Sequence, residues 1–374
     1  MDLTALLTAF GSAALVTALL TPLAGKLAIL LRIVDRPSDR KVNDREGIPL
    51  LGGLAVVVGC ALGLAAFVVF AEASQVEIVR ADLAAFMAAG MLLVLVGAWD
   101  DRFDLGAWQK IPFQLLASVI AINAGFEIDY FTNPFTLVIH ELPNWVSWPI
   151  TLGWIMVVTN AMNLIDGLDG LTTGIGAIIA GTLAIICFQA DQLTGLLIGA
   201  VMLGSLLGFL PFNFPPARIF LGDAGALFIG FGLAVISIQG YRKAALLTFI
   251  VPLLALAVPL LDTALSVLRR FRAGKGIFSA DKMHMHHLLL AREGTHRRAV
   301  LWLYFQTLCF SVIALSFSEL KGYSAYLFLG AVIVLTIRLL RNLDVFAVES
   351  TGSEGEGDTE SSQGTATSAE GRHQ

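Results

Sequence analysis

Long apolar stretches separated by short polar segments follow one another along most of the chain. Because an α-helix needs about 20 apolar residues to cross the core of a bilayer, each long stretch predicts one transmembrane helix. Eleven such helices are predicted, over residues 3–31, 50–71, 82–99, 109–125, 146–160, 171–189, 194–211, 224–240, 245–268, 299–317 and 323–342. The pattern therefore predicts an all-α fold, a polytopic membrane helical bundle that occupies residues 1–345.

Composition strengthens this prediction. The 374 residues are 56% hydrophobic and 14% charged, whereas soluble proteins carry about 25% charged residues. A soluble globular enzyme is thereby excluded, and the expected partner is the lipid bilayer, with no nucleic acid. Residues 346–374 differ from the rest, because from residue 349 onward they are polar and acidic and contain no large apolar group. They are predicted to form a disordered acidic cytoplasmic tail.

The positions of Lys and Arg predict the orientation of the bundle. If the N-terminus lies outside, only Arg80, Arg242, Lys243 and Lys321 of the 24 Lys and Arg residues fall on the outer side. Positive residues are retained on the cytoplasmic side of a membrane. We therefore expect the N-terminus outside and the C-terminus in the cytoplasm.

Polar clusters interrupt the apolar sequence at predicted helix ends, all on the cytoplasmic side. The first is Asp100-Asp101-Arg102-Phe103-Asp104. Adjacent carboxylates repel each other unless a cation lies between them, and oxygen ligands without a nearby thiol suit Mg²⁺ or Mn²⁺. The alternative for this cluster is a solvated helix end.

A second cluster follows the fifth predicted helix, with the sequence Asn160-Ala-Met-Asn163-Leu-Ile-Asp166-Gly-Leu-Asp169-Gly170. Its Asn and Asp residues recur three apart, so one helical turn would place them on the same face. The glycines permit close approach of the backbone to a phosphate. The alternative is a polar cap between two helices, although a cap needs fewer such groups.

Two further clusters lie later in the chain. Asp223, between glycines at a predicted helix start, suits a metal site or a capped terminus, and Arg218 offers a fork for phosphate. Phe220 would either stack on a nucleotide base or pack against neighbouring side chains. His284, His286 and His287 could bind zinc, but the acids favour a harder ion, so diphosphate binding is the preferred interpretation; a solvated cluster is the alternative.

Together these motifs resemble the polyprenyl-phosphate N-acetylhexosamine-1-phosphate transferases of glycosyltransferase family 4. The DDxxD and His-x-His-His forms resemble the undecaprenyl-phosphate GlcNAc-1-phosphate branch more than the phospho-MurNAc-pentapeptide transferase of peptidoglycan synthesis, which is the alternative. The family's GDxGS sequence ends here in Ala226, which has no hydroxyl to contact a phosphate or a metal ion. The matching stretches, in order, are residues 48–53, 100–104, 160–170, 220–225 and 278–287.

The resemblance implies roles for individual residues. Asp101 and Asp223 would bind the metal ion, and Asp100, Asp101 and Asp166 would be catalytic. The first inner loop would contribute Arg45, with Lys41 as the alternative. The other substrate-binding residues would be Asn163, Gly167, Leu168, Asp169, Asn213, Arg218, Phe220, His284, His286 and His287.

The implied reaction moves N-acetylhexosamine-1-phosphate, foremost GlcNAc-1-phosphate, from a UDP-sugar to undecaprenyl phosphate and releases UMP. Mg²⁺ is the expected cofactor, with Mn²⁺ as a substitute. The active site is expected at the cytoplasmic face of the inner membrane. Asp100 is expected to orient or deprotonate the lipid phosphate, while a two-step route through an aspartyl-phosphate stays open.

Such a reaction initiates a cell-envelope polysaccharide such as O-antigen, and the sequence is compatible with a homodimer. The rival from another class is a transporter, whose site would lie near the midplane, where only Asp262 is expected.

Overall fold

The computed structural model describes residues 2–35, 47–71, 73–132, 139–241, 250–272, 274, 285, 288–290, 294–319, 327, 330, 331 and 334. Helices make up nearly all of this part, which confirms the all-α prediction. The predicted tail, residues 346–374, lies outside the described residues. The named helices are α1 (Leu3–Leu30), α2 (Gly52–Phe70), α3 (Ala73–Phe103), α4 (Ala107–Asn123), α5 (Asn144–Ile165), α6 (Leu171–Gln189), α7 (Leu193–Asn213), α8 (Gly222–Tyr241), α9 (Ile250–Ala255), α10 (Ala257–Arg272) and α12 (His296–Glu319).

Within the described residues, 8 helices are long and apolar enough to cross a membrane: α1, α2, α3, α5, α6, α7, α8 and α12. The fourth predicted stretch forms α4, which has 17 residues and is about 25 Å long at 1.5 Å per residue. The ninth stretch is divided at Leu256 into α9 and α10. Pro259 lacks an N–H, so it cannot continue the hydrogen-bond ladder across this junction. The last predicted stretch lies mostly outside the described residues, so the total of eleven stays a prediction.

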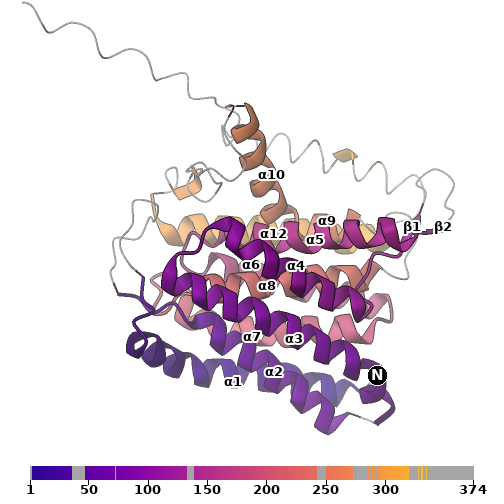
Figure 1. Ribbon diagram of the computed structural model, residues 1–374, viewed down its shortest axis with the longest axis horizontal. Coiled ribbons are helices and arrows are strands. Elements are labelled where there is room, and N and C mark those ends of the chain that lie inside the picture. Colours follow the sequence, from indigo (N-terminus) through magenta and orange to yellow (C-terminus); the bar gives the residue numbers. More distant parts are fainter. Residues whose placement is uncertain are drawn as a thin grey trace, which may run out of the picture.

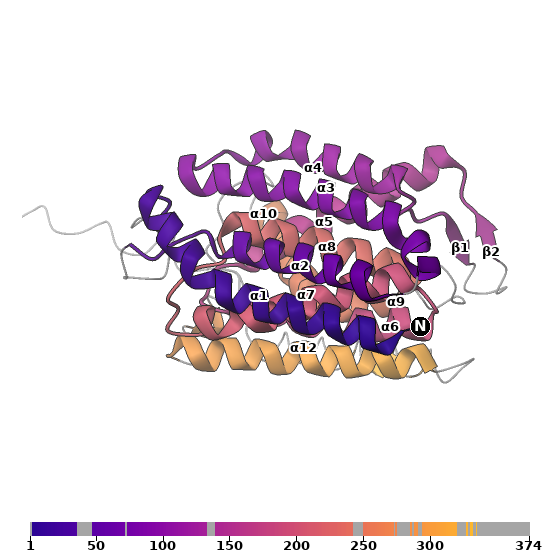
Figure 2. The ribbon, with the colours of Figure 1, turned by 90° about the horizontal axis from the view of Figure 1, so that it is seen from below.

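The helices run back and forth along one direction, and α10 runs across it (Figure 1). The bundle is centred on α8, which is almost completely buried and contacts α2, α3, α5, α6 and α7. Seen from below, α12 lies along one flank and α3 with α4 along the other (Figure 2). Helices α3, α5 and α7 finish at one end of the bundle, and α4, α6 and α8 begin at the same end. We call it the Asp100 end. Loops far apart in sequence meet there.

Small residues allow α1 to pack closely against α2 and α7. Every residue that α1 buries is Ala or Thr, mostly four positions apart, while most of its leucines are exposed. Glycines lie opposite on the partners, and a side chain at Gly59, Gly204 or Gly208 would collide with α1. Since lipid tails are as apolar as leucine, close contact between small residues is what favours helix association in a membrane.

A short hairpin interrupts the helical pattern at the opposite end of the bundle. Strands β1 (Tyr130–Thr132) and β2 (Ile139–Glu141) pair antiparallel between α4 and α5, with Phe131 opposite His140. The hairpin is remote from the Asp100 end, so it does not contribute to the site described next.

Candidate functional site

Two carboxylates and one ammonium group meet at the Asp100 end. Asp100 lies in the last turn of α3, Asp223 in the first turn of α8 and Lys110 in the first turn of α4. The Lys110 Nζ lies 2.6 Å from Asp223 Oδ2 and forms an ion pair with Asp100 as well. Asp100 is only 7% exposed, and a buried carboxylate requires a cation or hydrogen-bond donors. Lys110 therefore joins both acids into one charged cluster.

Asp101 faces a different partner from its neighbour. Its Oδ1 accepts a hydrogen bond from the N–H of Asp223 at 2.9 Å, and its Oδ2 accepts one from Ala224 at 3.3 Å. The first N–H groups of a helix have no partner within that helix, so Asp101 caps α8 from a separate helix. This contact fixes the main chain of Asp223. The expectation that Asp101 also binds the metal ion or takes part in catalysis stays a prediction.

Glycines make this approach of three helices sterically feasible. Gly222 has φ +73°, a backbone conformation that favours glycine, and a Cβ there would lie 2.5 Å from Asp101 Oδ2. A Cβ on Gly97 of α3 would lie 2.6 Å from the carbonyl carbon of Asp223. A Cβ on Gly53 of α2 would lie 2.9 Å from the carbonyl carbon of Ala224. The start of α8 is therefore enclosed by backbone on two sides.

Asn163, near the end of α5, completes the cluster. It interacts with Asp223, and its buried amide nitrogen forms no hydrogen bond of good geometry within the described residues. One turn earlier, Asn160 and Gln114 exchange reciprocal amide hydrogen bonds of 2.9 and 3.2 Å. Gln114 follows Lys110 by one turn of α4. This amide pair therefore sets the separation of Lys110 and Asn163.

The loops before α6 and α8 are bonded to each other. Asp169 is 2% exposed, and its Oδ2 accepts the N–H of Ala217 at 2.9 Å. Asn213 accepts a hydrogen bond from Thr173 at 2.7 Å and donates one to Ile219 O at 2.9 Å. Both residues were expected to contact substrate, but in the structure their side chains hold the loops in place. A direct role in substrate binding stays a prediction for each.

Other predicted substrate residues lie in the same two loops. Gly167 and Arg218 are exposed, while the side chain of Leu168 is buried in the main core. Phe220 is half-buried and packs against the cluster of Ala28, Ile33, Leu50 and Leu51. Its amide and carbonyl bond to Pro49 O at 2.8 Å and Gly52 N at 3.0 Å. Packing therefore accounts for Phe220, and stacking on a base stays a prediction.

The remaining predicted residues divide into two groups. Asp166 ends α5 at the Asp100 end, half-buried and three residues beyond Asn163, but the hydrogen bonds described above do not connect it to the Asp100–Asp223 cluster. Met285, between two of the predicted histidines, donates its N–H to Asp262 Oδ1 at 2.7 Å. The sequence predictions that lie outside the described residues are Arg45, His284, His286 and His287.

The donor set can be tested against the expected Mg²⁺ ion. Among the described residues, no group of three or more His, Cys, Asp and Glu side chains has the geometry of a metal site. Mg²⁺ in phosphate-transferring sites, however, is commonly held by one or two carboxylates together with water and substrate phosphates. Asp223 and Asp100 supply such carboxylates beside the amide of Asn163. These hard donors fit the ion, and the nearby positive charge of Lys110 suits a phosphate.

The sequence pattern alone does not identify several residues that build the site. It places Lys110 only among the basic residues of an inner loop, although its position one turn into an apolar helix, shortly after the paired acids, is a usable signal. Gln114, Thr173 and Gly97 give no signal that distinguishes them from other residues of their helices. Their roles depend on which helices become neighbours.

Comparisons with known proteins identify the family of the chain. A model of glycosyl transferase family 4 matches residues 83–241. The chain is 34% identical over 330 residues to the probable undecaprenyl-phosphate N-acetylglucosaminyl 1-phosphate transferase of Bacillus subtilis (strain 168), with 88% of each chain covered. It is 32% identical over 365 residues to the decaprenyl-phosphate N-acetylglucosaminephosphotransferase of Mycobacterium leprae (strain TN), covering 89% of this chain and 90% of the relative.

A third relative is the undecaprenyl-phosphate alpha-N-acetylglucosaminyl 1-phosphate transferase of Yersinia pestis, 30% identical over 285 residues with 74% of each chain covered. None of these three proteins is a peptidoglycan translocase or a transporter. Several helices long enough to span a bilayer, together with these bacterial relatives, make the protein a multi-pass membrane protein. The chain belongs to glycosyl transferase family 4, in the branch of the polyprenyl-phosphate N-acetylglucosamine-1-phosphate transferases.

Proposed function

We propose that this protein transfers GlcNAc-1-phosphate from UDP-GlcNAc to undecaprenyl phosphate, giving undecaprenyl-diphospho-GlcNAc and UMP. The observation that carries the proposal is the cluster of Asp100, Asp223 and Lys110 at one end of an apolar bundle. A polyprenyl tail must stay in hydrocarbon and a nucleotide sugar must stay in water, so their phosphates meet only at such an end. The relatives' names support the choice of acceptor and sugar.

In this proposal, Asp223 and Asp100 would hold Mg²⁺, which would supply positive charge to offset the diphosphate of the donor when the bond to UMP breaks. The Lys110 ammonium group, which lies beside both carboxylates, would donate a hydrogen bond to a phosphate oxygen of the donor. The Asn163 amide donates to another oxygen of the diphosphate. Asp100 orients the lipid phosphate, which attacks the β-phosphorus; a phosphate monoester has its second pKa near 6, so it needs little help from a base.

The location and biological role belong to the same proposal. Lys and Arg gather on the Asp100 side of the membrane, which supports a site facing the cytoplasm in the inner membrane. The product would then initiate a cell-envelope polysaccharide.

The test is an assay of the purified protein in detergent with undecaprenyl phosphate, Mg²⁺ and a panel of UDP-sugars. We expect UMP release with UDP-GlcNAc, its loss on chelation of the metal, and a fall of at least about 100-fold for Asp223→Asn. The matched control is Asp191→Asn, which changes an exposed acid in the loop between α6 and α7, at the opposite end. Failure to release UMP from any donor, or an unchanged rate in Asp223→Asn, would refute the proposal. Exchange of labelled UMP into UDP-GlcNAc without lipid would instead select the two-step route.

A further inference from the structure

Helix α12 contacts both loops of the site, although it lies outside the region that the family model matches. It begins at His296, at the Asp100 end, and packs against α6 and α9. Two of its side chains, Arg297 and Tyr304, reach main-chain carbonyl groups. They lie two turns apart, so they share one face of the helix.

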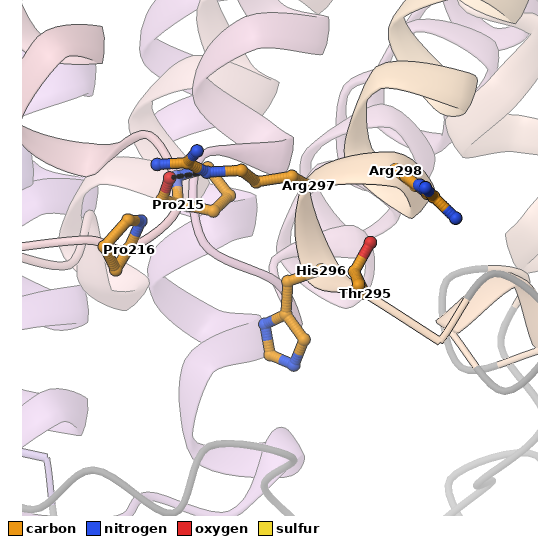
Figure 3. Close-up of a pocket in the computed structure, with 6 residues that line it drawn as sticks. All are labelled: Pro215, Pro216, Thr295, His296, Arg297 and Arg298. Atoms are coloured by element: carbon orange, nitrogen blue, oxygen red, sulfur yellow. Dashed lines mark hydrogen bonds between the residues drawn. The ribbon is translucent and has the colours of Figure 1, made fainter.

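Arg297 reaches the loop between α7 and α8. Its Nε donates a hydrogen bond of 2.7 Å to Pro215 O, beside a cavity of about 460 Å³ lined by Pro215, Pro216 and the start of α12. Figure 3 shows the Arg297 guanidinium extending over Pro215, whereas Arg298 points away from the loop. A proline has no N–H of its own, so its carbonyl is the group by which this point of the loop can be held.

Tyr304 reaches the loop between α5 and α6. Its hydroxyl donates a hydrogen bond to Gly170 O, at the start of α6. The ring lies directly over Gly174, where any side chain would collide with it. The Tyr304 ring therefore packs tightly against α6, and its hydroxyl group points toward the loop.

The two loops are held to each other by direct contacts. Asp169 binds Ala217 across them at 2.9 Å, and a Cβ at Gly170 would lie only 3.3 Å from Asn213 O. The second loop runs on through Leu221, whose carbonyl accepts the N–H of Gly53 at 2.8 Å, to Asp223. A displacement where α12 holds the loops would therefore be transmitted to the first turn of α8.

We propose that Arg297 and Tyr304 are positioning residues for the nucleotide-sugar donor, which they serve by bracing these two loops. The inference rests on the proposed function. The loops lie at the polar ends of the helices, where a water-soluble donor arrives, while the acceptor must enter from the lipid. Loss of the brace therefore weakens donor binding and leaves acceptor binding nearly unchanged.

The test uses the full-length protein with the substitutions Tyr304→Phe, Arg297→Met and Arg297→Lys. Tyr304→Phe removes only the hydroxyl, and Arg297→Lys keeps a donor for Pro215 O. Arg298→Met is the matched control, because the same change is made one residue along on a side chain that points away. Initial rates are measured against UDP-GlcNAc and undecaprenyl phosphate separately, and UMP binding is measured by calorimetry without turnover.

For Tyr304→Phe and Arg297→Met we expect the KM for UDP-GlcNAc and the Kd for UMP to rise about tenfold. The KM for undecaprenyl phosphate should stay within about twofold, and Arg297→Lys should recover most of the loss. An unchanged Kd for UMP, or an equal rise in both KM values, would overturn the inference; if one variant does not fold, the remaining variants decide between the same outcomes. If the wild-type protein transfers sugar phosphate and the variants have the same KM for UDP-GlcNAc as the wild-type protein, only this inference is refuted. If the wild-type protein releases no UMP, the proposed function is refuted.

Discussion

Two adjacent carboxylates in α3 have different tasks. Successive residues of an α-helix point about 100° apart, so Asp100 faces Lys110 of α4 while Asp101 faces the start of α8. Asp100 Oδ1 also accepts the N–H of Leu105 at 2.6 Å, which fixes the turn between α3 and α4. The pair is thus one acid that binds Lys110 and one acid that holds the helix carrying Asp223.

This division predicts different responses to a thiophilic metal ion. In Asp223→Cys, a thiolate would replace the carboxylate that we propose as a metal ligand, and soft ions such as Cd²⁺ bind thiolates well. We expect this variant to lose activity with Mg²⁺ and to regain at least about tenfold with Cd²⁺. Asp101→Cys should lose activity as well, because thiols are weak acceptors for the N–H groups of Asp223 and Ala224, but Cd²⁺ should not restore it.

The measurement is the rate of UMP release in each metal ion, relative to the wild-type protein in the same ion. The wild-type protein controls for any general effect of Cd²⁺ on the reaction. Recovery of Asp101→Cys by Cd²⁺ would show that Asp101 binds the metal ion, as the resemblance to the family implies.

The sequence predicted which polar residues gather at this end, but not what each one contacts. Asp100, Asp101, Asn163 and Asp223 are brought together as expected. Asn213, expected to contact substrate, instead bonds to Thr173 and Ile219. An asparagine that binds a ligand and an asparagine that binds a loop cannot be distinguished in the sequence, because both are the same residue type in the same kind of polar motif. Only the neighbours from other helices distinguish the two roles.

At the scale of helices, glycines set how closely the elements approach. The chain has 36 glycines, and the apolar pattern does not tell which of them lie at a contact. Gly97 meets the backbone of α8, whereas Gly153 of α5 has no atom within 4 Å of an added Cβ. Both lie inside apolar helices, so the difference arises only from packing between helices.

These two glycines form a matched pair for substitution. Gly97→Ala would push α3 away from α8 and move Asp101 off the N–H groups that it caps. We expect it to destabilise the fold by about 1–3 kcal/mol, the usual cost of overpacking, and to lower activity more than tenfold. Gly153→Ala should leave both unchanged, because alanine also favours helix. Thermal unfolding in detergent and UMP release measure the two effects, and equal behaviour of the variants would contradict this account of the contact.

At the scale of the whole molecule, hydropathy predicted most of the bundle. Each of the 8 candidate spans corresponds to a predicted stretch. The pattern did not predict the division at Leu256 or the direction of α10, because an apolar run does not show where a helix breaks within it. It did place the motifs around Asp100, Asp166 and Asp223 at one end, since each lies between two helices and successive helices alternate in direction. The side of the membrane to which that end belongs rests on the Lys and Arg distribution alone.

Orientation can be measured with single cysteines placed at the two ends. Arg218 is exposed at the Asp100 end and Asp191 is exposed at the opposite end, so each can be replaced by Cys after Cys60, Cys187 and Cys309 are changed to Ala. Because most Lys and Arg flank the Asp100 end, a membrane-impermeant maleimide should label Asp191→Cys in intact cells. It should label Arg218→Cys only in inverted vesicles, where the cytoplasmic face is outward. Labelling of Arg218→Cys in intact cells would place the carboxylate cluster outside the cytoplasm, away from a nucleotide-sugar donor.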